Sequence, residues 1–121
     1  MSDLKVQTVA HPDGTVIVQL AGHADIAGAG VLERNLTFLS AKHPKHVIFD
    51  LSAVEFISSL AMGVIMQFRR GCTTWGGRVT LAAAQAMVFA AFKHAGLHAL
   101  LPMTETVAAA LASEGATQVT P

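Results

Sequence analysis

The sequence predicts a single α/β domain: a mixed sheet of four to five strands with about four helices. Segments typical of strands alternate with segments typical of helices, an order that favours parallel strands joined by crossover helices. The run HVIFDL (46–51) is apolar except near its end, as expected of a strand covered on both faces. The length of 121 residues suits one domain, which we expect over residues 1–113, followed by a mobile tail over 114–121.

The N-terminal half begins with two strands that are close enough to pair as a hairpin. Residues 4–10 alternate weakly and are expected to form an edge strand, and HPDG (11–14) a turn. TVIVQL (15–20) is rich in β-branched residues and predicts the second strand. Asp25 can cap the helix expected over 26–41, in which three leucines follow helical spacing: Leu32, Leu36 and Leu39.

The second half continues the alternation after the strand at 46–51. The elements expected there are a helix over 59–74, a strand over 78–83, a helix over 84–95 and a short helix over 104–113. WGG (75–77) closes the first of these helices, Gly96 suits the end of the next, and Thr104 can cap the last. We find no internal repeat.

Composition and charge exclude several function classes. Eight basic and eight acidic residues give a net charge of zero, which argues against nucleic acid as a partner. The single cysteine, Cys72, excludes an internal disulfide and a cysteine-cluster metal site. The N-terminus lacks the pattern of a signal peptide, and the longest apolar tract, LAAAQAMVFAAF, is too short to cross a bilayer. We therefore expect a cytoplasmic domain with no direct membrane insertion.

The helix over 59–74 is apolar on more than one face. One stripe at helical spacing should face the core: Ala61, Ile65, Phe68 and Cys72. Further apolar side chains lie on other faces: Leu60, Met62, Val64 and Met66. Such a helix is either enclosed by its own neighbours or presents a second apolar face to a partner. Because methionine suits adaptable surfaces, Leu60, Met62 and Met66 are our candidate partner-binding residues.

Two adjacent serines, Ser58 and Ser59, stand at the start of this helix. One of them can be the N-cap, a role that needs a single hydroxyl. The other is a candidate for phosphorylation, since a phosphate there would meet free backbone N–H groups and the positive end of the helix dipole. The phosphate would add a charge of roughly −1.5 to −2 to an apolar surface and so repel a hydrophobic partner.

Four segments together carry a resemblance to a known family: DLSAVEFISSLAMGVI, LAGHADIAGAG, WGGRVTLAAA and HAGLHALLP. They resemble segments of the STAS domain, the family of anti-sigma-factor antagonists and of the cytoplasmic domains of sulfate transporters. In the family signature, a strand ending in Asp-Leu leads to Asp-Ser-(Ser/Thr/Ala)-Gly-Leu-Gly at a helix start. The resemblance extends over nearly the whole chain and implies the STAS fold.

The resemblance also implies roles for residues around the two serines. The family's phosphorylatable serine falls on Ser59 in preference to Ser58, which stands where the family usually has aspartate. Asp25 and Asp50 match acidic residues of the family, and they are expected to shape a pocket beside Ser59. Leu60 stands where the family has a small residue, which adds apolar bulk to the expected docking surface.

By this resemblance the chain is a protein-binding regulator, with no catalytic residue, metal or cofactor. In anti-sigma-factor antagonists the unphosphorylated domain captures an anti-sigma factor that is itself a serine kinase. Phosphorylation ends the capture, and a serine phosphatase restores it. We expect the same partners here, and a second copy of the chain is a further candidate. The alternatives are an unphosphorylated STAS scaffold, a lipid-transport accessory subunit, or a STAS domain that senses a small ligand.

The histidines form no recognisable metal or catalytic motif. His94 and His98 are four positions apart, but a glycine between them is expected to end the helix. His43 and His46 flank Pro44 in a predicted loop and are expected to be structural or surface residues. No G-x-S-x-G elbow surrounds Ser59, so serine hydrolysis is not expected.

Overall fold

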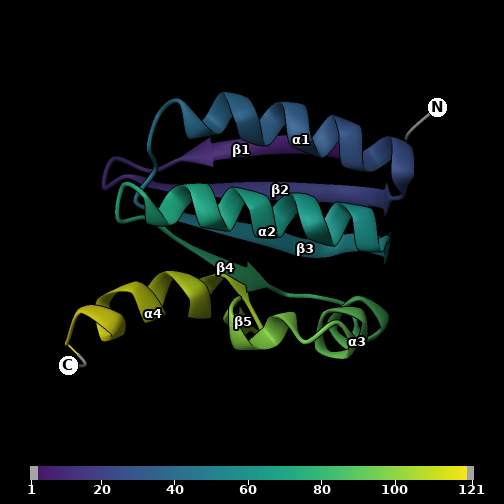
Figure 1. The fold of residues 1–121 in the computed structure, drawn as a ribbon. Coiled ribbons are helices and arrows are strands. Elements are labelled where there is room, and N and C mark those ends of the chain that lie inside the picture. Colours follow the sequence, from purple (N-terminus) through teal and green to yellow (C-terminus); the bar gives the residue numbers. More distant parts are fainter. Residues whose placement is uncertain (1–2, 120–121) are drawn as a thin grey trace.

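The computed structural model describes residues 3–119, with side chains for residues 3–113. In chain order the elements are β1 (Lys5–Ala10), β2 (Thr15–Ala24), α1 (Ile26–Ser40), β3 (His46–Ile57), α2 (Ser59–Thr73), β4 (Arg78–Ala82), α3 (Ala86–His94), the 3-10 turn η1 (Leu97–Ala99), β5 (Met103–Thr104) and α4 (Val107–Val119). Helices α1 and α2 cover one face of a single sheet, and α4 packs on the other (Figure 1). Helix α3 lies near the end of the sheet at which α1 and α2 begin (Figure 1).

The sheet has five strands in the order β1-β2-β3-β4-β5. β1 and β2 form the predicted antiparallel hairpin, and β2, β3, β4 and β5 run parallel to one another. Helix α1 connects β2 to β3, and helix α2 connects β3 to β4, as expected of crossover units. The predicted α/β class, with a mixed sheet of up to five strands and about four helices, is therefore confirmed.

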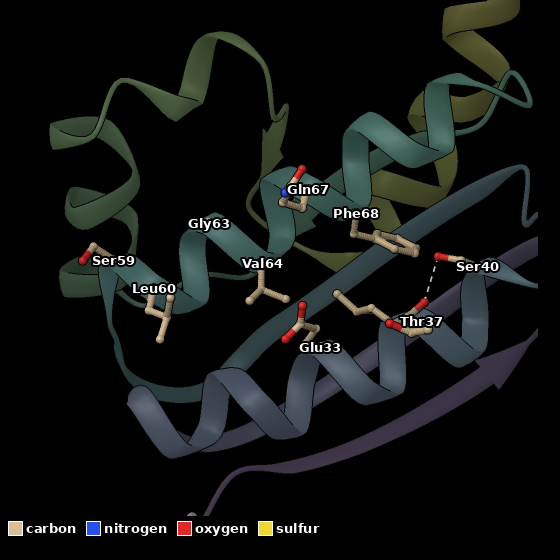
Figure 2. A pocket seen from close by; sticks show the side chains of 10 residues that line it. Glu33, Thr37, Ser40, Ser59, Leu60, Gly63, Val64, Gln67 and Phe68 are labelled. Atoms are coloured by element: carbon tan, nitrogen blue, oxygen red, sulfur yellow. Dashed lines mark hydrogen bonds between the residues drawn. The ribbon is translucent and has the colours of Figure 1, made fainter.

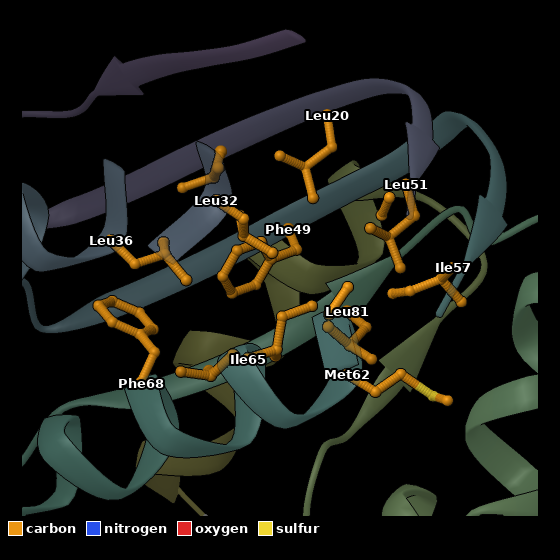
Figure 3. Close-up of a cluster of buried hydrophobic side chains, with 14 of the residues drawn as sticks. Leu20, Leu32, Leu36, Phe49, Leu51, Ile57, Met62, Ile65, Phe68 and Leu81 are labelled. Atoms are coloured by element: carbon orange, nitrogen blue, oxygen red, sulfur yellow. The ribbon is translucent and has the colours of Figure 1, made fainter. Parts of the chain in front are cut away.

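Buried side chains form two clusters, one on each side of the sheet. The larger cluster joins β2 and β3 to helices α1 and α2 (Figure 3), and in it Phe49 packs edge-to-face on Phe68 with ring centroids 6.1 Å apart. The predicted inward stripe of α2 is buried there: Ala61, Ile65, Phe68 and Cys72. Burial raises the pKa of the Cys72 thiol to about 11, as expected of an unreactive core cysteine. The smaller cluster joins Ile17 and Ile48 to Ala110 of α4.

Strands β2 and β3 both extend beyond the ends expected at residues 20 and 51. β2 continues to Ala24 and β3 to Ile57, and these two residues pair across the strands. The added pairs are interrupted by register irregularities between Gln19 and Ala21 and between Gly22 and His23. Because an irregular register disturbs the alternation of buried and exposed residues, the sequence pattern of these extensions does not predict strands.

The C-terminal elements also differ from the prediction. The two-residue strand β5 occupies Met103–Thr104, where the sequence predicts a helix start. Helix α4 instead begins at Val107, after Thr106, whose Oγ1 accepts a hydrogen bond of 3.0 Å from the backbone N–H of Ala109. It continues to Val119, past the helix end expected at 113, and residues 120–121 of the expected tail lie outside the described residues. Within residues 3–119, no helix is both long and apolar enough to cross a membrane.

Candidate functional site

Helices α1 and α2 begin side by side at the carboxyl ends of β2 and β3 (Figure 1). Ala24 and Ile57, the last residues of these strands, are paired, and the backbone N–H of Ser58 donates to the carbonyl oxygen of Ala24 at 2.8 Å. The two helix N-termini are therefore held together, each with its own capping side chain. Asp25 caps α1 by accepting from the N–H of Gly28 at 2.7 Å, as predicted.

The structure gives the two serines different positions. Ser58 is the N-cap of α2, and its Oγ accepts from the N–H of Ala61 at 3.1 Å. Ser59 is the first residue of the helix, and its side chain is exposed. The prediction that one serine caps the helix is confirmed, and the cap is Ser58. The hydroxyl of Ser59 is the more accessible of the two.

A groove of about 470 Å³ runs between α1 and α2 and includes Ser59 at its edge (Figure 2). Its apolar lining comes from both helices: Leu36, Leu60, Val64 and Phe68. Polar side chains rim it, and Glu33 of α1 carries its carboxylate on the side facing α2 (Figure 2). Gly63 lies on this groove where there is room for a side chain, since a Cβ added there would have no heavy atom within 4 Å.

Large apolar side chains are exposed on the elements that adjoin the start of α2. Leu60 is 52% exposed, Ile26 at the start of α1 is 74% exposed, and Phe56 near the end of β3 is 48% exposed. These residues stand on three elements that meet where α1 and α2 begin. Exposed large apolar residues on adjoining elements are typical of a protein-binding region.

Two of the predicted partner-binding residues are buried instead. Met62 and Met66 are each 8% exposed and belong to the larger core cluster, in which Figure 3 labels Met62. The wider inward face of α2 has a physical cause: the helix packs against both α1 and the sheet, including β4. The predicted second apolar face is therefore wrong for these methionines, and of the three candidates only Leu60 lies on the surface.

The two predicted pocket aspartates are on different parts of the molecule. Asp25 lies beside the start of α2, as described above. Asp50 lies well before the end of β3, between Phe49 and Leu51, which point into the cluster under α1 and α2. Because side chains alternate along a strand, Asp50 points to the opposite face of the sheet, where its Oδ1 accepts from the N–H of Ser52 at 3.0 Å. The prediction that Asp50 lies in a pocket with Ser59 is wrong.

A charged cluster near the helix starts was not predicted. His23, near the end of β2, has its Nδ1 2.7 Å from Asp3 Oδ2 and its Nε2 3.3 Å from Glu55 Oε1. The hydrogen bond and charge of Asp3 raise the pKa of His23, and the bond to His23 lowers the pKa of Asp3. The three residues are far apart in sequence, and no motif spacing connects them. Within the described residues, no group of three or more histidine, cysteine or acidic side chains is arranged to hold a metal.

Comparison with known proteins identifies the family of this fold. Residues 7–110 match the family model of the STAS domain. A curated relative, the anti-sigma-F factor antagonist RsfB of Mycobacterium tuberculosis, is 33% identical over 58 residues, which are 48% of this chain and 48% of that protein. This chain therefore matches about half the length of its curated relatives.

Solved structures share the whole fold. The crystal structure of an anti-sigma factor antagonist from Mycobacterium paratuberculosis has a TM-score of 0.84 and 24% identity, covering 92% of this chain and 93% of that one. The anti-sigma factor antagonist SpoIIAA in its unphosphorylated form has a TM-score of 0.78 and 19% identity, covering 88% and 93%. SpoIIAA of Bacillus is also solved in its phosphorylated form, with a TM-score of 0.71, 18% identity and coverage of 90% and 98%. At these identities the likeness concerns the fold.

Proposed function

Because the chain belongs to the STAS domain family, we propose that it is an anti-sigma-factor antagonist, which binds an anti-sigma factor where α1 and α2 begin. The curated relative RsfB carries this name, as do two of the structural relatives. The observation that carries the proposal is the pair of exposed residues at the start of α2, a hydroxyl on Ser59 and a large apolar side chain on Leu60. The role is binding rather than catalysis.

The proposed regulator of this binding is phosphorylation of Ser59. Ser58 is less suited to modification because its Oγ is engaged as the cap of α2. A phosphate on Ser59 would lie at the N-terminus of α2, where it is tolerated electrostatically, and at the edge of the apolar groove. The structural relative SpoIIAA exists in unphosphorylated and phosphorylated forms, which supports a switch of this kind.

The proposed partners are an anti-sigma factor that is also a serine kinase and a serine phosphatase that reverses its action, both in the cytoplasm. The kinase would contact Leu60, Ile26 and Phe56 while Ser59 enters its active site. Met62 and Met66 would act indirectly, since they pack beneath the surface and fix the position of α2. Asp25 would keep the start of α1 in place beside the phosphorylated residue.

Mass spectrometry of the protein purified from its native cells, with phosphatase inhibitors present, tests the switch. The expected result is a phosphate on Ser59. Phosphate confined to Ser58 would assign the switch to the capping residue and contradict the geometric argument. Absence of phosphate under every growth and stress condition would favour an unphosphorylated STAS scaffold or a lipid-transport accessory subunit. The serine at position 58, where the family usually has aspartate, favours that second class.

Binding measurements with the kinase test the surface. Leu60→Asp should weaken binding about tenfold or more, because it places a charge in an apolar contact. Phe38→Asp is the matched control: Phe38 is 74% exposed, but it lies in the last turn of α1, away from the helix starts. Ser59→Asp should also weaken binding, and Ser59→Ala should retain it. Equal losses for Leu60→Asp and Phe38→Asp would mean that the helix starts are not the interface.

A small-ligand sensor is the second candidate function, and the groove between α1 and α2 favours it. Its volume of about 470 Å³ is in the range of small-molecule sites, and its lining combines apolar and polar side chains. A ligand in this groove would contact Leu60 and lie beside Ser59, so that it would compete with the kinase. A melting-temperature increase with a small apolar molecule, abolished by Gly63→Phe, would support this function.

A further inference from the structure

The charged residues of this electrically neutral chain are unevenly distributed over its two ends. Five basic residues lie in the segment between α1 and β3, near the C-terminal end of α2 and at the start of β4: Lys42, Lys45, Arg69, Arg70 and Arg78. We call this part of the molecule the basic end. Among the charged side chains that the structure describes there, Asp13 is the acidic one. The opposite end, where α1 and α2 begin, carries Asp3, Asp25 and Glu55 together with Lys5 of β1 and Lys93 of α3.

Backbone hydrogen bonds join the segments of the basic end into one surface. The N–H of Lys45 donates to the carbonyl of Gly14 at 2.9 Å, and the N–H of Arg78 donates to the carbonyl of Lys45 at 3.0 Å. The β1–β2 turn, the segment before β3 and the segment before β4 are thus bonded in series. The basic residues they carry therefore belong to one tip of the domain.

Two aromatic residues accompany these charges. Phe38, in the last turn of α1, is 74% exposed, and Lys42 Nζ lies 5.7 Å from its ring centroid. Trp75, just after α2, donates from Nε1 to the carbonyl of Pro44 at 2.8 Å and is stacked on His43 with ring centroids 4.5 Å apart. The indole is therefore held firmly at the tip and is partly exposed. Nothing in the proposed kinase interface uses these residues, since that interface is at the other end.

We propose that the basic end docks on the surface of an anionic phospholipid bilayer. The combination of an exposed and a partly exposed aromatic ring with lysine and arginine matches the headgroup region, where aromatic rings lie at the boundary and basic groups contact phosphates. The opposite end, where acidic residues outnumber the lysines, would be attracted less by the same surface, which orients the domain. In this orientation Ser59 faces away from the membrane and remains open to a protein partner. Membrane docking is therefore a second activity, separate from the proposed binding of an anti-sigma factor.

The chain's single tryptophan makes the test direct, because Trp75 lies in the proposed contact. The full chain is titrated with vesicles of equal parts phosphatidylglycerol and phosphatidylcholine, and with vesicles of phosphatidylcholine alone. We expect a blue shift of tryptophan emission and co-sedimentation with the anionic vesicles only, both weakened by added salt. No binding to anionic vesicles at low salt, or equal binding to both kinds, overturns the proposal.

Charge reversal tests the location of the contact. Each basic residue near an anionic surface contributes roughly fivefold in affinity, so Lys42→Glu with Lys45→Glu should weaken vesicle binding at least about tenfold. The matched control is Lys5→Glu with Lys93→Glu, which changes the net charge equally but lies outside the basic end. All four side chains are exposed, and unchanged melting temperatures would establish folding. Equal losses of vesicle binding in the two double variants would mean that net charge alone determines binding, which overturns the proposal.

Phe38→Ala separates a lipid surface from other polyanions, since it leaves the charge unchanged and removes an exposed apolar ring. It should weaken vesicle binding several-fold. Unchanged binding would contradict insertion at the headgroup level. A single-stranded oligonucleotide or an acidic peptide that binds the chain more tightly than the anionic vesicles, at the same salt concentration, would assign the basic end to that partner and overturn the lipid assignment.

Discussion

Leu60 and Met62, two apolar residues at the start of α2, should respond very differently to truncation. Met62 is 8% exposed and lies in the core, so Met62→Ala removes buried contacts and leaves a cavity. Such substitutions cost about 2–4 kcal/mol. Leu60 is 52% exposed, so Leu60→Ala should cost about 1 kcal/mol or less, because much of its side chain is already in water.

The difference between these two losses of stability is large enough to measure in a simple assay. For a domain of this size, 1 kcal/mol lowers the melting temperature by roughly 3–6 °C. Met62→Ala should therefore lower it by about 10 °C and Leu60→Ala by about 3 °C, in thermal melts followed by circular dichroism, with urea unfolding as an independent check. Kinase binding should show the opposite order once both variants are folded. A larger stability loss for Leu60→Ala than for Met62→Ala would refute the assignment of Met62 to the core.

Three further predictions follow from local geometry. Gly28→Ala should lower the free energy of unfolding, measured in urea, by about 1–3 kcal/mol, because the added Cβ would lie 2.8 Å from a backbone oxygen. Gly30→Ala should raise it by about 0.5–1 kcal/mol, because the nearest atom to the added Cβ would be 3.7 Å away. A change of the same sign in both variants would contradict this reasoning. Because the pKa of His23 is raised in the folded protein, His23 stabilises the fold below about pH 6.5, and this contribution is lost as the pH rises through the raised pKa. Because the pKa of Asp3 is lowered in the folded protein, Asp3 stabilises the fold above about pH 3.9, and this contribution is lost as the pH falls through the lowered pKa. His23→Ala should remove both contributions to the pH dependence of stability, as measured by the melting temperature over a range of pH values. Cys72, with its pKa raised to about 11, should react with a thiol reagent at pH 8 only as fast as the protein unfolds, and rapid labelling of the native protein would contradict its burial.

The sequence predicted best those features that depend on local chemistry. Asp25 and a serine of the pair could be identified as caps because a short polar side chain before an apolar helical pattern has a specific hydrogen-bonding role. The choice of Ser58 over Ser59 could not be made, because it depends on where β3 ends. That end is set by pairing with β2, which is a tertiary contact.

Features that depend on distant partners could not be predicted. Met62 and Met66 have the spacing of a second helix face, and only the packing of α2 against both α1 and the sheet decides that this face is covered. His23, Asp3 and Glu55 have no common motif and meet only because β2 and β3 are longer than their apolar runs. Asp50 was assigned to the wrong face because the predicted strand ended beside it, whereas the real strand continues.

The side-by-side start of α1 and α2 has a consequence for how sequences of this fold can change. The N-termini of both helices lie side by side, so an anion at Ser59 would meet the field of the α2 peptide array, with that of α1 beside it. That field belongs to the main chain, and no single side-chain replacement can delete it while the fold persists. Mutation can alter the caps, the hydroxyl and the apolar rim, and so decide which partner or kinase is accepted. The capacity to accommodate a negative charge is inherited with the topology itself.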